Sequence, residues 1–110
     1  MSDIFDGPPV HPLRDLFDAA VRHKSVKLTC TRCRHAKTFS AAALWWLFHR
    51  KGWQDDFEQV RRRFVCGLCL VRLHMRVRSP RLELVDDDPT DESFPLPSEL
   101  DWKRELRRRR

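Results

Sequence analysis

No apolar run in the 110-residue sequence approaches the roughly 20 residues that a membrane-spanning helix needs. The longest such run, Ala41–Phe48, is far too short. The N-terminal residues carry Asp3 and Asp6 and lack a basic region followed by an apolar one, so we expect no secretory signal there. We therefore expect a cytoplasmic protein without a membrane partner, in a reducing compartment where disulfides are rare.

The sequence also lacks the motifs of the common enzyme classes. It contains no nucleophile elbow and no phosphate loop, and its five histidines and its carboxylates follow no recognisable catalytic spacing. We therefore expect no enzymatic activity.

Carboxylates are scarce in the centre of the chain. Residues 21–82 contain three Asp or Glu against 15 Lys or Arg, which gives this segment a charge of +12. Residues 1–20 and 83–110 are each net acidic, so the overall charge of +6 conceals a strongly basic centre. Such asymmetry favours a polyanionic partner, and nucleic acid is the usual one.

The basic centre contains all four cysteines of the chain, as two C-x-x-C pairs: Cys30 with Cys33, and Cys66 with Cys69. A two-residue spacer lets a tight turn direct both sulfurs at one ion, and two such turns complete a tetrahedral thiolate shell that suits zinc. Iron held by the same ligands stays open as an alternative. Because four thiolates leave no position for water, we predict one structural Zn²⁺, and we expect Cys30→Ser to lose the metal and unfold the domain.

Hydrophobic spacing predicts three helices and a β-hairpin before the second cysteine pair. Ser40 and Gly52 suit the two ends of the middle helix. The predicted elements are a helix at about 12–23, a strand at 26–30, its return at 35–39, and helices at 41–51 and about 54–63.

After the second pair, apolar and basic residues alternate from Val71 to Arg78. Period two over eight residues predicts a strand with one apolar and one basic face. Residues 82–85 are a candidate for its return strand.

Composition divides the chain into four segments. Residues 1–11 form an extended leader, and residues 12–85 form the zinc-binding domain. Residues 86–97 are an acidic, proline-rich linker, and residues 98–110 a short C-terminal helix, begun by a capping box at Ser98, with a basic tail.

Residues 26–78 resemble the zinc-ribbon type of domain, in which two C-x-x-C knuckles on β-hairpins share one zinc. They are especially similar to small, largely uncharacterised bacterial proteins in which a helical insert separates the knuckles. The resemblance implies a small α+β fold with two hairpin knuckles, a helical insert and an N-terminal helix. Many zinc ribbons place glycine after the second cysteine of each knuckle, where this chain has Arg34 and Leu70.

We predict that the domain binds DNA or RNA as a regulatory or accessory factor. Alternate side chains of a strand stand about 6–7 Å apart, close to the phosphate spacing of a nucleic-acid strand. The candidate contact residues are Arg72, His74, Arg76, Arg78, Arg32, Arg34, Lys37, Arg61 and Arg62.

The alternative function is a protein-docking adaptor that uses the Trp-rich helix and the C-terminal helix. Its candidate contacts are Trp45, Trp46, Trp102 and Leu106. The sequence leaves the choice between DNA, RNA and a protein partner open, together with the oligomeric state and the biological process.

Overall fold

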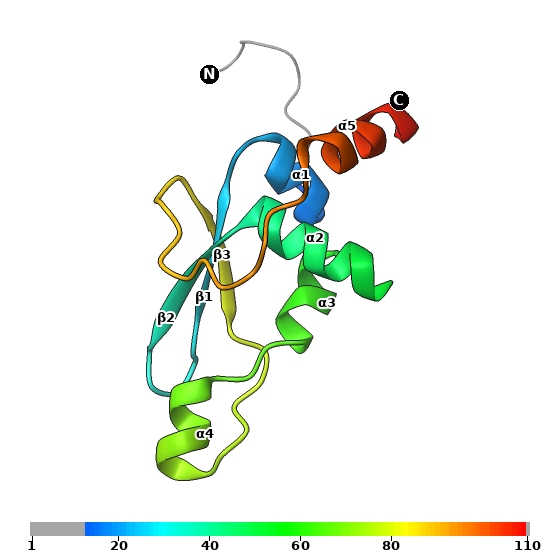
Figure 1. The fold of residues 1–110 in the computed structure, drawn as a ribbon. Helices are drawn as coiled ribbons and strands as arrows, with labels where there is room; N and C mark the ends of the chain where they lie inside the picture. The colour runs from blue at the N-terminus through cyan, green and yellow to red at the C-terminus, as the bar shows by residue number, and fades with distance from the viewer. Residues whose placement is uncertain (1–12, 110) are drawn as a thin grey trace, which may run out of the picture.

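The fold is a three-stranded antiparallel sheet with helices against it, which confirms the predicted α+β class (Figure 1). The computed structural model describes residues 13–109, so the predicted leader lies outside the described residues. Strand β1 (Ser25–Thr29) lies in the centre and pairs with both β2 (Ala36–Ser40) and β3 (Arg81–Val85). Within the described residues, no helix has the length and apolar character needed to cross a membrane.

Helix α2 (Ala41–Lys51) has the bounds that the sequence predicts. The Ser40 hydroxyl oxygen accepts a hydrogen bond from the backbone N–H of Ala43 and caps the first turn. Gly52 ends the helix in the left-handed region, at φ 69°, where a residue without Cβ avoids strain.

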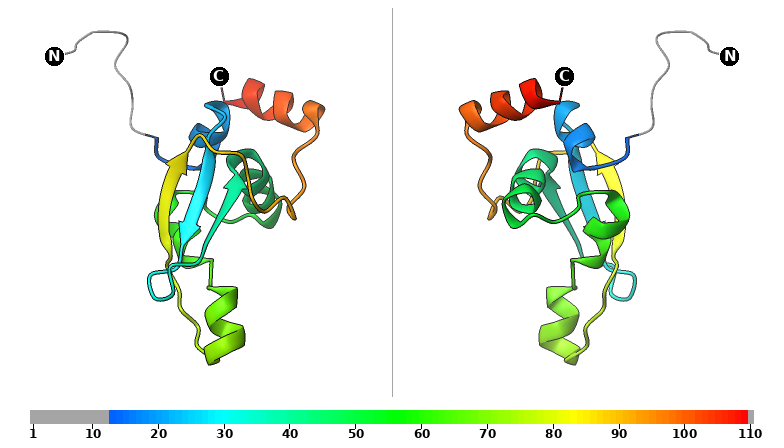
Figure 2. Two further views of the ribbon diagram at one scale, coloured as in Figure 1. Left: turned by 90° about the vertical axis from the view of Figure 1, so that its left-hand side faces the viewer. Right: turned by 90° about the vertical axis from the view of Figure 1, so that its right-hand side faces the viewer.

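The helices before and after α2 are shorter than predicted, because aspartates inside the predicted ranges cap them. Asp15 accepts a hydrogen bond from Asp18 N–H and begins α1 (Leu16–Val21). Asp56 does the same for α3 (Phe57–Arg62). Helices α2 and α3 lie on one side of the sheet (Figure 2). The largest fully buried side chains in the main core between these elements are Trp45, Phe48, Leu16, Leu44, Val26 and Val60.

The strand predicted over Val71–Arg78 is wrong. Helix α4 (Gly67–Leu73) occupies its first part, and the chain then returns without regular structure to a single bridge between Val65 and Arg78. Alternating apolar and basic residues form a strand when another layer covers the apolar face. The described structure places no layer over this segment, and Val71 is 75% exposed. The second cysteine pair therefore sits at the start of a helix and not on a β-hairpin, and β3 pairs with β1 instead.

Residues 86–97 have no regular secondary structure, yet they lie along the free edge of β2. The backbone N–H groups of Thr90 and Asp91 both donate to the carbonyl of Thr38. The ring of Phe94 stacks on Phe39 with centroids 5.5 Å apart. These contacts hold residues 90–94 against β2 before the chain enters the last helix.

Helix α5 (Glu99–Arg108) begins at Ser98, whose hydroxyl accepts a hydrogen bond from Asp101 N–H as the capping box predicts. The Trp102 ring packs on Phe17 and Trp45, with both centroid distances 5.3 Å. Helix α5 thus lies beside α1, at the end of the molecule opposite to α4 (Figure 1).

Candidate metal centre

The first cysteine pair lies in the tight turn between β1 and β2. Cys30 directly follows β1, and its sulfur accepts the backbone N–H groups of Arg32 and Cys33 at 3.4 and 3.5 Å. The Cys30 N–H donates to the carbonyl of His35 and closes the hairpin. Arg34 adopts φ 66°, so the residue after the second cysteine takes the left-handed conformation for which many knuckles use glycine.

The second pair is built by the first turn of α4. The Cys66 sulfur occupies the N-cap and accepts the backbone N–H of Cys69 at 3.4 Å. The Cys66 N–H donates to the carbonyl of Val77, which ties the helix start to the returning chain. Leu70 follows inside the helix, and this explains why no glycine is needed there.

The two pairs converge into one cluster. All four sulfurs lie within 4.8 Å of one another, and they form a group that can hold a metal ion. The sulfur of Cys30 is 3.8 Å from that of Cys69, and the sulfur of Cys33 is 3.6 Å from that of Cys66. Cys30 and Cys69 are buried, Cys66 is half-buried and Cys33 is exposed, so the cluster closes toward the sheet and opens on one side.

Local hydrogen bonds give the thiols different acidities. Burial opposes ionisation of Cys30, but hydrogen bonds from the N–H groups of Cys33 and Arg32, together with those from the Cys66 and Cys33 side chains, outweigh it and lower the pKa of this thiol to about 6. Burial raises the pKa of the Cys69 thiol to about 12, and hydrogen bonds with the other cysteines act in the same direction. Because a metal requires thiolates, binding of an ion must displace the Cys69 proton.

We use the name metal lobe for residues 30–35 and 65–80, which project from one end of the sheet (Figure 2). The lobe contains no Asp or Glu. Its six predicted nucleic-acid contacts are all exposed, and none forms an ion pair with another described residue. They are Arg32, Arg34, Arg72, His74, Arg76 and Arg78.

The other three predicted contacts lie outside the lobe and have partners in the fold. Arg61 donates to the carbonyls of Pro80 and Ser79 and pairs with Glu58, so it anchors the chain that leaves the lobe. Arg62 shares Glu58, at 3.5 Å. Lys37 forms an ion pair of 3.2 Å with Asp91. These cations are already neutralised in part.

Sequence reasoning missed two apolar features near the cysteines. The first is an exposed ridge on and after α4, made of Leu70, Val71, Leu73 and Met75. The second is a cavity of about 300 Å³ beside the cluster, which we call the aromatic pocket. Its walls include Phe39, Phe64 and Phe94. Phe94 belongs to residues 86–97, which the sequence predicts as a linker. The sequence therefore gives no sign of the pocket, which forms because this segment packs along β2.

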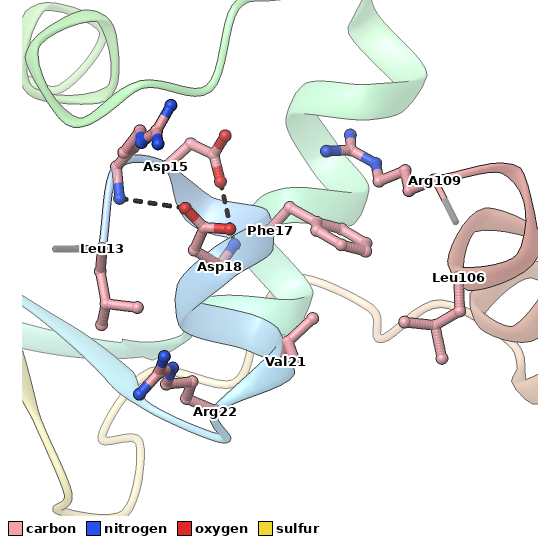
Figure 3. A pocket seen from close by; sticks show the side chains of 9 residues that line it. Leu13, Asp15, Phe17, Asp18, Val21, Arg22, Leu106 and Arg109 are labelled. Atoms are coloured by element: carbon pink, nitrogen blue, oxygen red, sulfur yellow. Dashed lines mark hydrogen bonds between the residues drawn. The ribbon is translucent and has the colours of Figure 1, made fainter. Parts of the chain in front are cut away.

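The residues predicted for protein docking lie in a different place and serve the interior. Trp45 is 2% exposed in the core, and Trp102 packs against it, so α5 covers the surface that the sequence suggested for a partner. A cavity of about 550 Å³ remains between α1 and α5, with Leu106 on its wall (Figure 3). There the guanidinium of Arg109 lies 3.9 Å from the centroid of the Phe17 ring. This cavity lies between the two helices and is remote from the cysteines.

No protein family, no curated protein and no solved structure matches the chain. The likeness to a metal-binding domain therefore rests on the four clustered cysteines. The fold and the cluster together define a small α+β domain with a centre that can hold a metal ion.

Proposed function

We propose that the four cysteines hold one structural Zn²⁺. A zinc–sulfur distance of about 2.3 Å gives a tetrahedron with sulfur–sulfur edges of about 3.8 Å. Two of the sulfur pairs, at 3.6 and 3.8 Å, match this edge, and all four sulfurs lie within 4.8 Å of one another. Four thiolates complete the shell of the ion, so the centre has no open position for a substrate or water, and the proposal includes no enzymatic activity.

The proposed partner of the domain is nucleic acid, bound by the metal lobe. The observation that carries this proposal is the exposed cluster of arginines on a lobe without carboxylates. On α5, by contrast, the exposed Lys103 and Arg104 each form an ion pair with a carboxylate. Unpaired arginines are suited to phosphates, which they bind without reading the base sequence.

The test is binding of labelled DNA and RNA across a salt series, on protein whose metal content has been measured. Arg72, Arg76 and Arg78 are changed together to Gln, and Lys103, Arg104 and Arg107 on α5 serve as a control with the same loss of charge. Each lost phosphate contact should reduce the slope of log affinity against log salt by about 0.7–0.9. We expect a shallower slope for the lobe variant and the wild-type slope for the control. Equal slopes in all three proteins would refute the lobe as the contact surface.

A protein partner is the second candidate function, because the apolar ridge on α4 is exposed. Leu70, Val71 and Leu73 are not among the residues packed on the core, and Arg72 and Arg76 lie beside them in the sequence. Arginine, methionine and large apolar residues together are frequent in protein interfaces. If neither nucleic acid binds at low salt while zinc is present, this ridge becomes the better candidate surface.

A further inference from the structure

The aromatic pocket lies at the border between the metal lobe and the sheet. Cys30 and Cys66 lie on its wall, together with Gly67 at the start of α4. A group seated in it would therefore lie beside the cysteine cluster, at the base of the lobe that carries the arginines. With about 300 Å³, it has the size of the smallest ligand sites and suits one ring system.

The walls of the pocket include three phenylalanine rings, two of which are only half-buried. Phe39 is buried, but Phe64 and Phe94 are half-buried and sit at the margin of the core. Phe39 contacts both of the other rings, with centroid distances of 5.7 and 5.5 Å. Partly exposed phenylalanine rings offer a planar apolar surface on which another ring can stack.

Polar groups stand at the mouth of the same pocket. Asp91 and Ser93 are among the lining residues, together with Lys37 and His35. The carboxylate of Asp91 is fixed by the N–H and hydroxyl of Ser93 and by Lys37. An apolar slot with a carboxylate acceptor and cationic donors at its edge matches a heterocycle with polar edges better than it matches a hydrocarbon chain.

We infer that the aromatic pocket receives one unpaired base of a single-stranded nucleic acid whose phosphates lie on the arginines of the metal lobe. This inference rests on the proposed function and adds a ligand class to it. Stacking on aromatic side chains is the usual way in which proteins bind single strands without sequence preference. A duplex offers no such base unless one is extruded from the stack, so the protein should prefer single strands.

The test compares a short single-stranded oligonucleotide with an otherwise identical one in which the bases are replaced by abasic sites. Both have the same phosphates, so a difference in affinity reports contacts with the bases, and the variants below show whether the pocket makes them. We expect wild-type protein to bind the base-bearing strand about 5- to 100-fold more tightly. Phe94→Ala should lose most of this preference and keep its affinity for the abasic strand. Phe57→Ala removes a half-buried ring from α3, which does not line the pocket, and should keep the preference.

The outcomes separate this inference from the proposed function. Equal binding of both strands with a steep salt slope would overturn the base pocket and leave nucleic-acid binding in place. A base preference that survives in Phe94→Ala would also overturn it. Binding of neither strand would refute both ideas, and a shift of the Phe94 ring resonances by N-acetylphenylalanine amide would then assign the pocket to a protein side chain.

Discussion

Removal of the metal should unfold the metal lobe and leave the core folded. The buried core contains no residue of the lobe: its members come from α1, α2, α3 and the sheet. Helix α4 has seven residues, well below the roughly 12–15 that an isolated helix needs in water. Among its side chains only Cys69 is buried, and its burial depends on the cluster.

The size of the effect follows from the bonds that hold the lobe. Ordering the dozen or so residues from Cys66 to Val77 costs about 1–2 kcal/mol each in backbone entropy. The backbone hydrogen bonds there return only about 1 kcal/mol each, so the ion must supply the remainder. Structural zinc in small domains contributes about 10–16 kcal/mol, which covers this difference. Loss of α4 should lower the helical circular dichroism by about one sixth, its share of the helical residues.

Hydrogen exchange measured with and without a chelator tests this prediction directly. Amides of 66–78 should lose protection, while those of β1 and α2 keep it. The tryptophan fluorescence should stay constant, because all four tryptophans lie outside the lobe. Cys66→Ser should reproduce the effect without a chelator. If the sheet and the lobe lost protection at the same chelator concentration, the metal lobe would not unfold independently of the core, and this prediction would be refuted. That result would support instead the expectation from sequence that loss of one cysteine ligand unfolds the whole domain.

Three further predictions concern single residues. Arg34→Gly removes the strain of a left-handed residue and should stabilise the metal-bound lobe by about 1 kcal/mol. Metal transfer to a competing chelator should therefore be slower, and faster transfer would show that Arg34 is not strained. Burial, and then the charge of Asp15, raises the pKa of Asp55, so the folded state favours the protonated carboxyl. The stabilisation that goes with the protonated form is present at low pH and is lost as pH rises through the folded-state pKa. Asp55→Asn should therefore increase stability to urea at pH 7 and change little at pH 3. Hydrogen bonds from Arg108 and Arg109 lower the pKa of buried Glu105. The ionised carboxylate therefore stabilises the fold above the unfolded-state pKa of this group, and that stabilisation is lost as pH falls through the folded-state pKa. Glu105→Gln should cost about 1–3 kcal/mol at pH 7 in urea unfolding, and an unchanged midpoint would contradict it.

The predictions from sequence hold where local chemistry decides the structure. Ser40 and Gly52 predict both ends of α2, and Ser98 predicts the start of α5, because each cap satisfies backbone groups within one turn. The two cysteine pairs likewise predict a single cluster, because the two-residue spacer brings both sulfurs of a pair together in the hairpin turn at Cys30 and in the first turn of α4 alike.

Long-range packing decides the features that the sequence does not predict. Alternation over Val71–Arg78 assumes a covered face, but whether such a face exists depends on the rest of the fold. Trp45 and Trp102 read as a docking surface until α5 is seen to fold back on α1 and α2. Phe94 reads as part of a linker, and only the hydrogen bonds to Thr38 bring it to the sheet.

The division into a core and a metal lobe links the proposed centre to the proposed binding surface. Arg72, Arg76 and Arg78 lie within residues 66–78, where Cys69 is the one buried side chain, so the ion determines where their charges are held. The aromatic pocket has walls from both parts: Phe39 belongs to the core and Phe64 to its margin, whereas Cys66 and Gly67 move with α4. Without metal, one wall of the pocket would separate from the other while both phenylalanines stayed in place. Base preference and metal should therefore be lost together, before the core unfolds, and a residual phosphate affinity should remain because the unfolded lobe keeps its arginines.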